Sequence, residues 1–384
     1  MIPFGKPIIE KKTINNVSRV LKNKKLVHGP IIKKFEKKFS QFTNAKYCLG
    51  VSSCTSGMHL IYYYLNLKKG DEVIIPSQTH VATAMAVEAV GAKPVFVDSD
   101  CKSGNIDIEK IEEKITKKTK VITVVHYLGL PVEMTNVLKL AKKYKLFVLE
   151  DCALSLGSRY KGTHTGLLGD AGVFSFYPVK HITTSEGGMI ITKNKNLYNS
   201  LKLMRAFGVN KDHNSRKIPG EYDAIYKGIN CRMSEIEAAI GVDQINKIKD
   251  FIKIRVRNYL FLKEKLKKIK SITFQKSNLK KSFFWSYYCF TIVLDSKIKK
   301  FRKKIINKIN KSGIGTSIYY PQPVPNMTYF RNKYNKNKKI KFKNSEKFSY
   351  QTIMLPIAQH VTKRDAEFIS KTLLKILKPY EKFK

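Results

Sequence analysis

The sequence predicts an α/β protein, with a large domain built on a mostly parallel seven-stranded sheet flanked by helices and a smaller C-terminal α+β domain. In the first half of the chain, short runs rich in Val and Ile alternate with helix-length segments, which is typical of a parallel sheet covered by helices. The runs are apolar throughout, as expected for strands buried on both faces. After about residue 245 the alternation ends and a long basic helical segment begins.

Seven apolar runs are the predicted strands of the large sheet. They are Tyr47–Val51, Glu72–Pro76, Pro94–Val97, Val121–Val125, Phe147–Glu150, Val173–Phe176 and Met189–Thr192. Helices are expected between them, among others at Ser56–Leu67, Ile108–Ile115 and Thr135–Tyr144. A length of 384 residues suits two domains. We predict a large domain over residues 1–245 and a small domain over residues 246–384.

The predicted small domain opens with a long basic helix over Asp250–Lys268. Three strands and two further helices are expected after it, the strands near Ile272–Phe274, Tyr287–Leu294 and Gly315–Tyr320 and the helices near Ile298–Asn310 and Thr362–Leu377. The basic stretch Asn332–Lys347 has the composition of a loop. This mixed order of elements favours an α+β arrangement.

Composition excludes several classes of protein. Hydrophobic residues make up 43% of the chain and aromatic residues 11%, which is too apolar for a disordered protein. The sequence contains neither an uninterrupted run of about 18 apolar residues nor the apolar N-terminal stretch of a signal peptide. The six cysteines form no CxxC pair and the eight histidines show no HExxH-like spacing. We therefore expect a cytoplasmic protein without a membrane span, with reduced thiols and without a metal site.

The formal net charge of +44 permits two interpretations. Taken alone, it suggests that the protein binds nucleic acid or an anionic membrane. The excess is mostly lysine spread over the whole chain, and segments such as Lys297–Lys311 have the pattern of amphipathic helices with solvated lysine faces. We favour lysine as the default surface residue, with no specific nucleic-acid partner. A dedicated polyanion surface is the alternative, and a positive field would favour a phosphate-bearing substrate.

The segment Val51–Gly57 predicts a phosphate site. It reads VSSCTSG, follows a predicted strand and opens a predicted helix. Small and hydroxyl residues at a helix N-terminus leave backbone N–H groups directed at a bound anion. Ser175, at the end of a later strand, could supply a second hydroxyl. An ordinary Ser or Thr helix cap is the alternative interpretation.

Asp151 and Lys180 predict the chemistry of pyridoxal phosphate (PLP). Asp151 ends an apolar strand, where a buried carboxylate needs a partner such as a protonated pyridine nitrogen. Lys180 lies 29 residues downstream, between another apolar strand and the pair Gly187-Gly188. A partly buried lysine has a lowered pKa, so it can carry PLP as a Schiff base and then transfer protons. A helix-capping aspartate and a surface lysine are the alternatives.

The order of these segments resembles the DegT/DnrJ/EryC1/StrS family of sugar aminotransferases, which have the fold type I architecture of aspartate aminotransferase. The resemblance covers essentially the whole chain, and its specific parts are the Lys180 segment and Gly228–Ile236 (GINCRMSEI). Further matching segments are Ile2–Phe4, His28–Pro30, Gly70–Pro76, Tyr160–Gly162, Gly169-Asp170, Ala238–Gly241 and Leu355-Pro356.

The resemblance implies a role for three residues at the cofactor ring. Lys180 would hold PLP as a Schiff base, and Asp151 would pair with the pyridine nitrogen. His80 falls where the family places an aromatic residue stacked on the ring. On its own, a histidine at a strand end could equally be structural.

The resemblance also implies a phosphate site shared between two subunits. Thr55, the Cys54 backbone and Ser175 would bind the PLP phosphate within one subunit. Asn230, together with Arg232, would reach the same phosphate from the neighbouring subunit. The implied assembly is a homodimer with composite active sites.

Three departures from the family pattern concern the substrate pocket. His80 replaces the more usual Phe, Tyr or Trp, and Leu154 stands where the family often has Gln or His near the cofactor. Tyr319 and Pro325 occupy the region where a His-Tyr…His pattern commonly lines the sugar pocket. We take Tyr319 and Tyr320 as the candidate substrate residues, and the altered pocket leaves the identity of the sugar open.

The implied activity is a PLP-dependent transfer of an amino group from an amino acid, expected to be glutamate, to a keto-sugar. The acceptor is expected to be nucleotide-linked and to serve lipopolysaccharide, capsule or glycan synthesis; a free keto-octulosonic acid is the alternative. Dehydratase relatives have histidine at the lysine position, so Lys180 favours transamination. A sugar dehydratase and a non-enzymatic regulator that binds PLP or nucleic acid are the rival functions.

Overall fold

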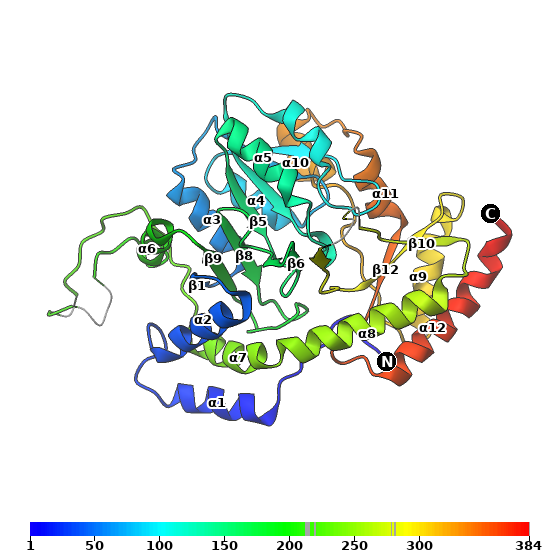
Figure 1. Ribbon diagram of the computed structural model, residues 1–384, viewed down its shortest axis with the longest axis horizontal. Coiled ribbons are helices and arrows are strands. Elements are labelled where there is room, and N and C mark those ends of the chain that lie inside the picture. The colour runs from blue at the N-terminus through cyan, green and yellow to red at the C-terminus, as the bar shows by residue number, and fades with distance from the viewer. Residues whose placement is uncertain (212–215, 219, 278, 280–281, 384) are drawn as a thin grey trace.

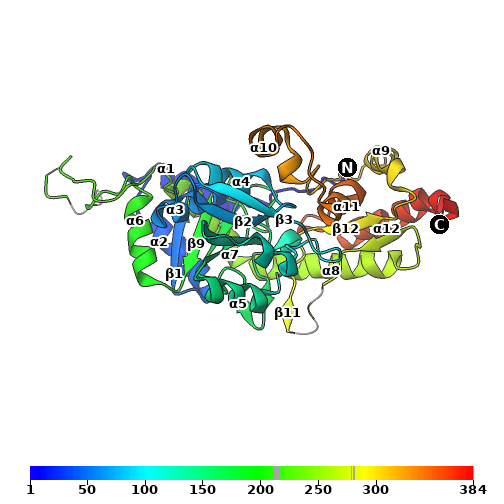
Figure 2. The ribbon, with the colours of Figure 1, turned by 90° about the horizontal axis from the view of Figure 1, so that it is seen from above.

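The computed structural model describes residues 1–211, 216–218, 220–277, 279 and 282–383. A large sheet with its helices lies towards one end of the long axis, and a smaller group of strands and helices lies towards the other (Figure 1). The long helix α8 (Ile248–Leu266) runs along the molecule between the two groups in both views (Figures 1 and 2).

The large sheet has seven strands in the order β1-β9-β8-β5-β4-β2-β3. Their bounds are Tyr47–Val51 (β1), Glu72–Pro76 (β2), Lys93–Val97 (β3), Thr119–Val125 (β4), Phe147–Asp151 (β5), Ala171–Ser175 (β8) and Gly188–Thr192 (β9). β9 pairs antiparallel with both β1 and β8, and the strands from β8 to β3 pair in parallel. The predicted mostly parallel sheet of seven strands is therefore confirmed.

Helices cover both faces of this sheet because its strands are apolar on both faces. Val73 and Ile75 of β2 belong to a core shared with α3 (Cys54–Tyr64), α4 (Val81–Glu88) and α6 (Lys195–Met204). Ile74, between them, belongs to a core on the opposite side with α5 (Met134–Tyr144). On that side β9 and β8 pack against α2 (Pro30–Thr43) and α7 (Glu235–Asn246).

A three-stranded antiparallel sheet organises the C-terminal part of the chain. It has the order β10-β12-β13, with the bounds Ile272–Phe274, Phe290–Leu294 and Thr352–Leu355. Leu262 of α8, Ile305 of α9 (Arg302–Lys311) and Leu373 of α12 (Lys363–Leu377) pack on it in one apolar core. The predicted domain division at residues 245 and 246 lies at the end of α7, and it stays a prediction.

Segments of the C-terminal half also return to the large sheet. Phe330 of α10 (Thr328–Tyr334) packs edge-on against Phe96 of β3, with 5.8 Å between ring centroids. α11 (Lys343–Gln351) carries Ser345, whose hydroxyl lies 2.7 Å from that of Ser77 after β2. The predicted loop Asn332–Lys347 thus contains the end of one helix and the start of another. A further small sheet joins β11 (Phe283–Phe284), β6 (Arg159–Tyr160) and β7 (Thr163–His164).

Two other expected elements differ in the structure. The segment Ile108–Ile115 forms two short 3-10 turns instead of one α-helix, and Gly315–Tyr320 forms a single bridge between Ser317 and Met354 instead of a strand. The 3-10 turns of the described chain are Ile108–Lys110, Glu112–Lys114, Tyr127–Gly129, Lys299–Phe301, Val324–Asn326 and Lys378–Phe383. None of the helices that the structure describes has both the length and the apolar character needed to cross a membrane.

The chain before α2 and the chain between α6 and α7 lie outside its layers. α1 (Lys11–Leu21) packs along α7, where Asn16 Nδ2 donates to Asp243 at 2.9 Å. Ile2 pairs with Ile314 beside the small sheet. Described parts of the connection that follows α6 extend away from the body of the molecule (Figure 1).

Candidate active site

Asp151 presents a buried carboxylate at the end of β5. Its Oδ2 accepts a hydrogen bond from Thr83 Oγ1 at 2.9 Å, and its Oδ1 accepts from the Ala153 amide at 3.1 Å and from Cys54 Sγ at 3.8 Å. These donors are all uncharged, so within the described part of the chain the carboxylate has hydrogen bonds but no ion pair. A buried carboxylate in that state is favourable when a cation lies next to it.

Lys180 lies in the turn that follows β8, where its amide donates to the carbonyl of Tyr177 at 2.9 Å. Burial lowers the pKa of the Lys180 ammonium group, and the nearby Cys54, Asp151 and Glu186 oppose that shift. Nζ lies 5.7 Å from the centroid of the Tyr288 ring. The structure thus brings Lys180 and Asp151 into one buried region, with a larger neutral fraction of the amine than a surface lysine has.

A serine capping box closes the N-terminus of α3, as the alternative interpretation of this segment expects, and the phosphate role of the turn stays a prediction. The Ser53 side chain accepts from the Ser56 amide at 3.0 Å in a capping box. The amides of Cys54 and Thr55 precede that bond and have no carbonyl one turn earlier to accept them. A Cβ at Gly188 would lie 2.5 Å from the Ser53 carbonyl carbon, so only glycine lets the start of β9 approach this turn.

Ser175 lies beside the same turn. It ends β8 and is paired in register with Gly188, the residue that contacts the start of α3. Its hydroxyl accepts weakly from the Tyr177 amide at 3.4 Å. The predicted phosphate ligands Cys54, Thr55 and Ser175 therefore lie on neighbouring elements.

His80 is the N-cap of α4, and its Nδ1 accepts from the Ala82 amide at 3.2 Å. Loss of water lowers the pKa of its imidazole, the charge of Lys180 lowers it further, and Asp151 opposes both effects. His80 is thus near both predicted catalytic residues, and its neutral ring can accept the Ala82 bond.

Tyr319 and Tyr320 lie at the boundary between the two groups of elements. The Tyr319 hydroxyl lies 2.7 Å from the Tyr288 hydroxyl, and the Tyr320 ring is 5.6 Å from the His80 ring in an edge-on contact. Burial raises the pKa of Tyr319 to about 12, so its hydroxyl stays protonated at neutral pH. Pro325 is buried in a 3-10 turn, where it offers no polar side chain to a substrate.

Asn230 and Arg232 lie on the segment that leads to α7. Asn230 is exposed and pairs with Ala206, whereas Arg232 pairs with Val51 and holds its guanidinium 5.3 Å from the centroid of the Phe207 ring. The backbone between them reaches the phosphate turn, because the Ser52 amide donates to the Cys231 carbonyl at 2.8 Å. Their roles stay predictions.

A basic cavity adjoins Arg232. Its volume is about 1070 Å³, and it is formed by α2, the end of α6 and the connection that follows. Glu36 is the acidic residue among its described lining, and it is paired with Arg205 at 3.1 Å. The cationic side chains of the lining are Lys33, Lys202, Arg205, Lys211, Arg216 and Arg232. This excess of positive charge suits a phosphate-bearing ligand.

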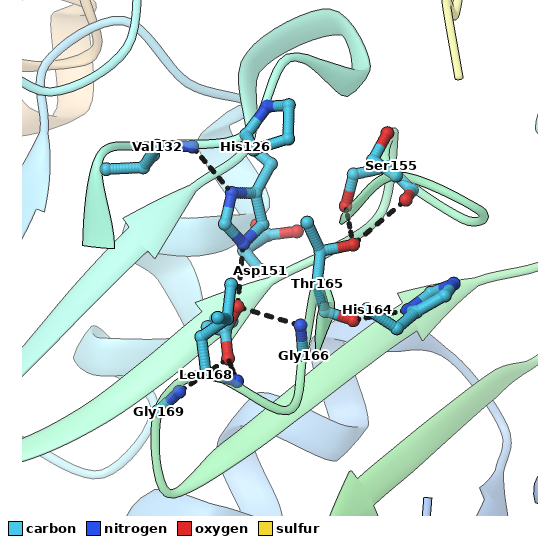
Figure 3. Close-up of polar contacts among 12 residues, drawn as sticks. His126, Val132, Asp151, Ser155, His164, Thr165, Gly166, Leu168 and Gly169 are labelled. Atoms are coloured by element: carbon cyan, nitrogen blue, oxygen red, sulfur yellow. Dashed lines mark hydrogen bonds and ion pairs between the residues drawn. The ribbon is translucent and has the colours of Figure 1, made fainter. Parts of the chain in front are cut away.

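A buried hydrogen-bond network lies next to the end of β5 (Figure 3). His126 Nε2 lies 2.9 Å from Glu150, and His126 Nδ1 accepts from the Val132 amide at 3.0 Å. The Glu150 carboxylate also accepts from the amides of Gly166, Leu168 and Gly169, each at 2.7 Å. Cys152 lies close enough to share a metal ion with this pair, but both ring nitrogens of His126 and both oxygens of Glu150 are already used in hydrogen bonds. We therefore interpret the cluster as a structural anchor.

Two neighbours of the predicted catalytic residues were not foreseen. Thr83 contacts Asp151 from α4, and Tyr288 lies against Lys180 from the segment before β12. Thr83 stands one helical turn after His80 in an otherwise apolar run, which was the available signal. Leu154 lies in an apolar cluster with Tyr288, away from any polar role.

Comparison with known proteins identifies the family. Residues 7–374 match the model of the DegT/DnrJ/EryC1/StrS aminotransferase family. GDP-perosamine synthase of Escherichia coli O157:H7 is 37% identical over 310 residues, which are 80% of this chain and 81% of the relative.

Solved structures agree with this match. The Helicobacter pylori aminotransferase PseC, involved in pseudoaminic acid biosynthesis, superposes with a TM-score of 0.91 at 29% identity, over 98% of this chain and 99% of the other. A Streptococcus pneumoniae protein in its PLP form gives a TM-score of 0.89 at 25% identity over 98% and 99% of the two chains. The chain therefore belongs to the DegT/DnrJ/EryC1/StrS aminotransferase family.

Proposed function

We propose that this protein is a PLP-dependent aminotransferase that acts on a nucleotide-linked keto-sugar, with glutamate as the expected amino donor, for surface polysaccharide or glycan synthesis. The observation that carries the proposal is the buried Asp151 carboxylate at the end of β5 beside the half-buried Lys180 in the turn after the neighbouring strand β8. The names of the relatives support the substrate class, because one is a GDP-perosamine synthase and another is an aminotransferase involved in the biosynthesis of pseudoaminic acid.

The residues present fit the cofactor. Asp151 lacks a cationic partner among the described residues, and a protonated ring nitrogen would supply one. The start of α3 offers the amides of Cys54 and Thr55 for a phosphate, and Ser175 offers a hydroxyl beside them. Lys180 would form the covalent bond to the cofactor, since its lowered pKa favours the nucleophilic neutral amine.

The catalytic work divides among three residues. When bound, PLP withdraws electrons from the carbon that loses or gains a proton. Lys180 would then hold and move that proton through Nζ, for which a pKa below that of a surface lysine is suited. The negative charge of the Asp151 carboxylate would lie next to the ring nitrogen and stabilise its protonated form. The His80 ring would cover the cofactor and exclude water.

The basic cavity supports a nucleotide-linked substrate over a free sugar. A diphosphate would neutralise part of the positive charge of the cavity lining, in which the described acidic residue, Glu36, is already paired with Arg205. The lining includes Arg232, which we propose to contribute to the active site of a second subunit. The cavity would in this way lie next to the partner's cofactor.

We propose a homodimer with composite sites. The connection after α6 exposes large apolar side chains on Phe207, Tyr222, Ile225 and Tyr226, and Val27 is exposed near α2. Large apolar side chains exposed in this number on one connection are typical of a subunit interface. Asn230 is exposed on the same connection, as a residue that serves the neighbouring subunit would be.

The half-reaction tests the function. The purified PLP-loaded protein should convert glutamate to 2-oxoglutarate in one equivalent, and the resulting amino form of the cofactor should then aminate a keto-sugar. GDP-linked, UDP-linked and free keto-sugars would be compared. A dehydratase would release no 2-oxo acid, so the absence of 2-oxoglutarate with saturating glutamate, and of the corresponding 2-oxo acid with each alternative amino acid, contradicts the proposal.

A further inference from the structure

A buried hydroxyl fixes one oxygen of Asp151. Thr83 is fully buried in the first turn of α4, and its Oγ1 lies 2.9 Å from Asp151 Oδ2. An ionised carboxylate only accepts hydrogen bonds, so the single Thr83 proton is donated to Asp151.

A second hydroxyl fixes the direction of the first. Thr79 is also fully buried, and its Oγ1 lies 2.8 Å from Thr83 Oγ1. Because the Thr83 proton is committed to Asp151, the Thr79 hydroxyl donates to Thr83. The chain from Thr79 through Thr83 to Asp151 therefore runs in one direction, and each donor strengthens the next bond.

The other oxygen of Asp151 is held by different donors. Oδ1 accepts from the Ala153 amide at 3.1 Å and from the Cys54 thiol at 3.8 Å. The two carboxylate oxygens thus have different donors on different elements, so rotation of the carboxylate would break bonds to α3, α4 and the turn after β5. These hydrogen bonds fix the direction of the lone pairs of the Asp151 carboxylate that stay free to accept another donor.

We infer that Thr83 is a positioning residue for Asp151, supported by Thr79, and that it sets the orientation of the carboxylate that pairs with the cofactor ring. This inference rests on the proposed role of Asp151. A hydroxyl facing a sheet from an otherwise apolar helix would be unfavourable without its acceptor. Because its acceptor is charged, the hydrogen bond from Thr83 to Asp151 is stronger than the one from Thr79 to Thr83.

Thr83→Val tests the inference, because it keeps the shape and removes the donor. Loss of a hydrogen bond to a charged group should weaken the affinity of the apo-protein for PLP about 10-fold to 100-fold, measured by absorbance titration. The spectrum of the bound cofactor should shift, and kcat should fall more than KM for glutamate rises. Thr83→Ser should restore all three. Thr79→Val should give a smaller loss in the same direction and serves if Thr83→Val does not fold.

Thr123→Val is the matched control. Thr123 is fully buried in β4, and its hydroxyl lies 2.7 Å from the neutral Tyr62 hydroxyl without contacting Asp151. This variant should bind PLP with wild-type affinity. An equal loss in Thr123→Val and Thr83→Val would overturn the inference, because it would mark a general packing effect.

Asp151→Asn separates failure of the inference from failure of the proposed function. If Asp151→Asn weakens PLP binding while Thr83→Val leaves affinity and spectrum unchanged, the inference on Thr83 is wrong and the role of Asp151 stands. If Asp151→Asn binds PLP as the wild type does, the proposed role of Asp151 is wrong, and the inference on Thr83 is overturned with it.

Discussion

Lys180 Nζ lies 5.7 Å from the centroid of the Tyr288 ring, whose hydroxyl lies 2.7 Å from that of Tyr319. The lysine follows a strand of the large sheet, whereas both tyrosines come from the C-terminal half of the chain. The C-terminal group of elements therefore supplies the aromatic side chains next to the predicted catalytic residue. Substitutions of these tyrosines should alter the catalytic activity of Lys180 without changing the residues that bind the cofactor.

Replacing Tyr288 should separate the roles of its ring and its hydroxyl. An aromatic ring near an ammonium group stabilises the charge by about 0.5–2 kcal/mol, so Tyr288→Leu should lower kcat about 2-fold to 30-fold. Tyr288→Phe keeps the ring and should retain most of the activity. Steady-state kinetics of both variants check this, and equal losses in the two would show that the hydroxyl contact with Tyr319 matters instead.

Lys180 should make the apo-protein less stable than its uncharged variant at neutral pH. The folded-state pKa of Lys180 is lowered, so between that value and the ordinary 10.5 the unfolded chain binds more protons than the folded one. Stability due to this group therefore rises as pH increases through that window. Lys180→Met should be more stable than the wild type at pH 7, with a gap that narrows towards pH 10. Denaturant unfolding at several pH values measures it, and a constant gap would contradict the shift.

Two inactive variants should complement each other if the active sites are composite. Mixed Lys180→Ala and Asn230→Ala subunits would form heterodimers in which one of the two sites keeps both residues. Random exchange should then restore about a quarter of wild-type activity, since half the dimers are mixed and each has one intact site. Exchange would be confirmed with differently tagged subunits. Exchanged dimers without activity would refute shared sites.

Charge reversal in the basic cavity should weaken binding of a nucleotide-linked substrate. Lys202 lines the cavity and Lys193 does not, although both are exposed. Lys202→Glu should raise KM for the nucleotide-sugar about 3-fold to 10-fold at low salt, less at high salt, and leave KM for glutamate unchanged. Lys193→Glu should match the wild type. Equal increases of KM in the two variants would indicate that the overall positive charge of the protein, and not the cavity, determines binding of the nucleotide-sugar.

The sequence predicts the large sheet well because its signal is local. Each strand is a short, continuous apolar run that ends in polar or small residues, and the predicted bounds differ from the observed ones by no more than two residues, as at Val121 against Thr119. Ile108–Ile115 was wrong as a helix. Ile111 lies between two short 3-10 turns, and this arrangement buries its side chain without a continuous α-helix. Gly315–Tyr320 was wrong as a strand, since it makes only the bridge of Ser317 to Met354.

The residues of the candidate site also differ in whether a local sequence pattern predicts them. Lys180, Asp151 and the turn at Cys54 could be predicted because each follows a strand, and strand ends gather at one edge of a parallel sheet. Thr83 and Tyr288 could not, because their contacts join segments 68 residues apart in one case and a different group of elements in the other. Their residue types carry no distinctive signal, and only the packing of α4 and of the chain before β12 gives them a role.

Locating the cofactor on the chain tests the central claim most directly. The PLP-loaded protein would be reduced with borohydride, which fixes the cofactor to its lysine, and the digested peptides would be analysed by mass spectrometry. We expect the pyridoxyl group on Lys180 alone, and no fixed cofactor in Lys180→Ala. A pyridoxyl group on another lysine, or none on a protein that shows the absorbance of bound PLP, would contradict the assignment of Lys180.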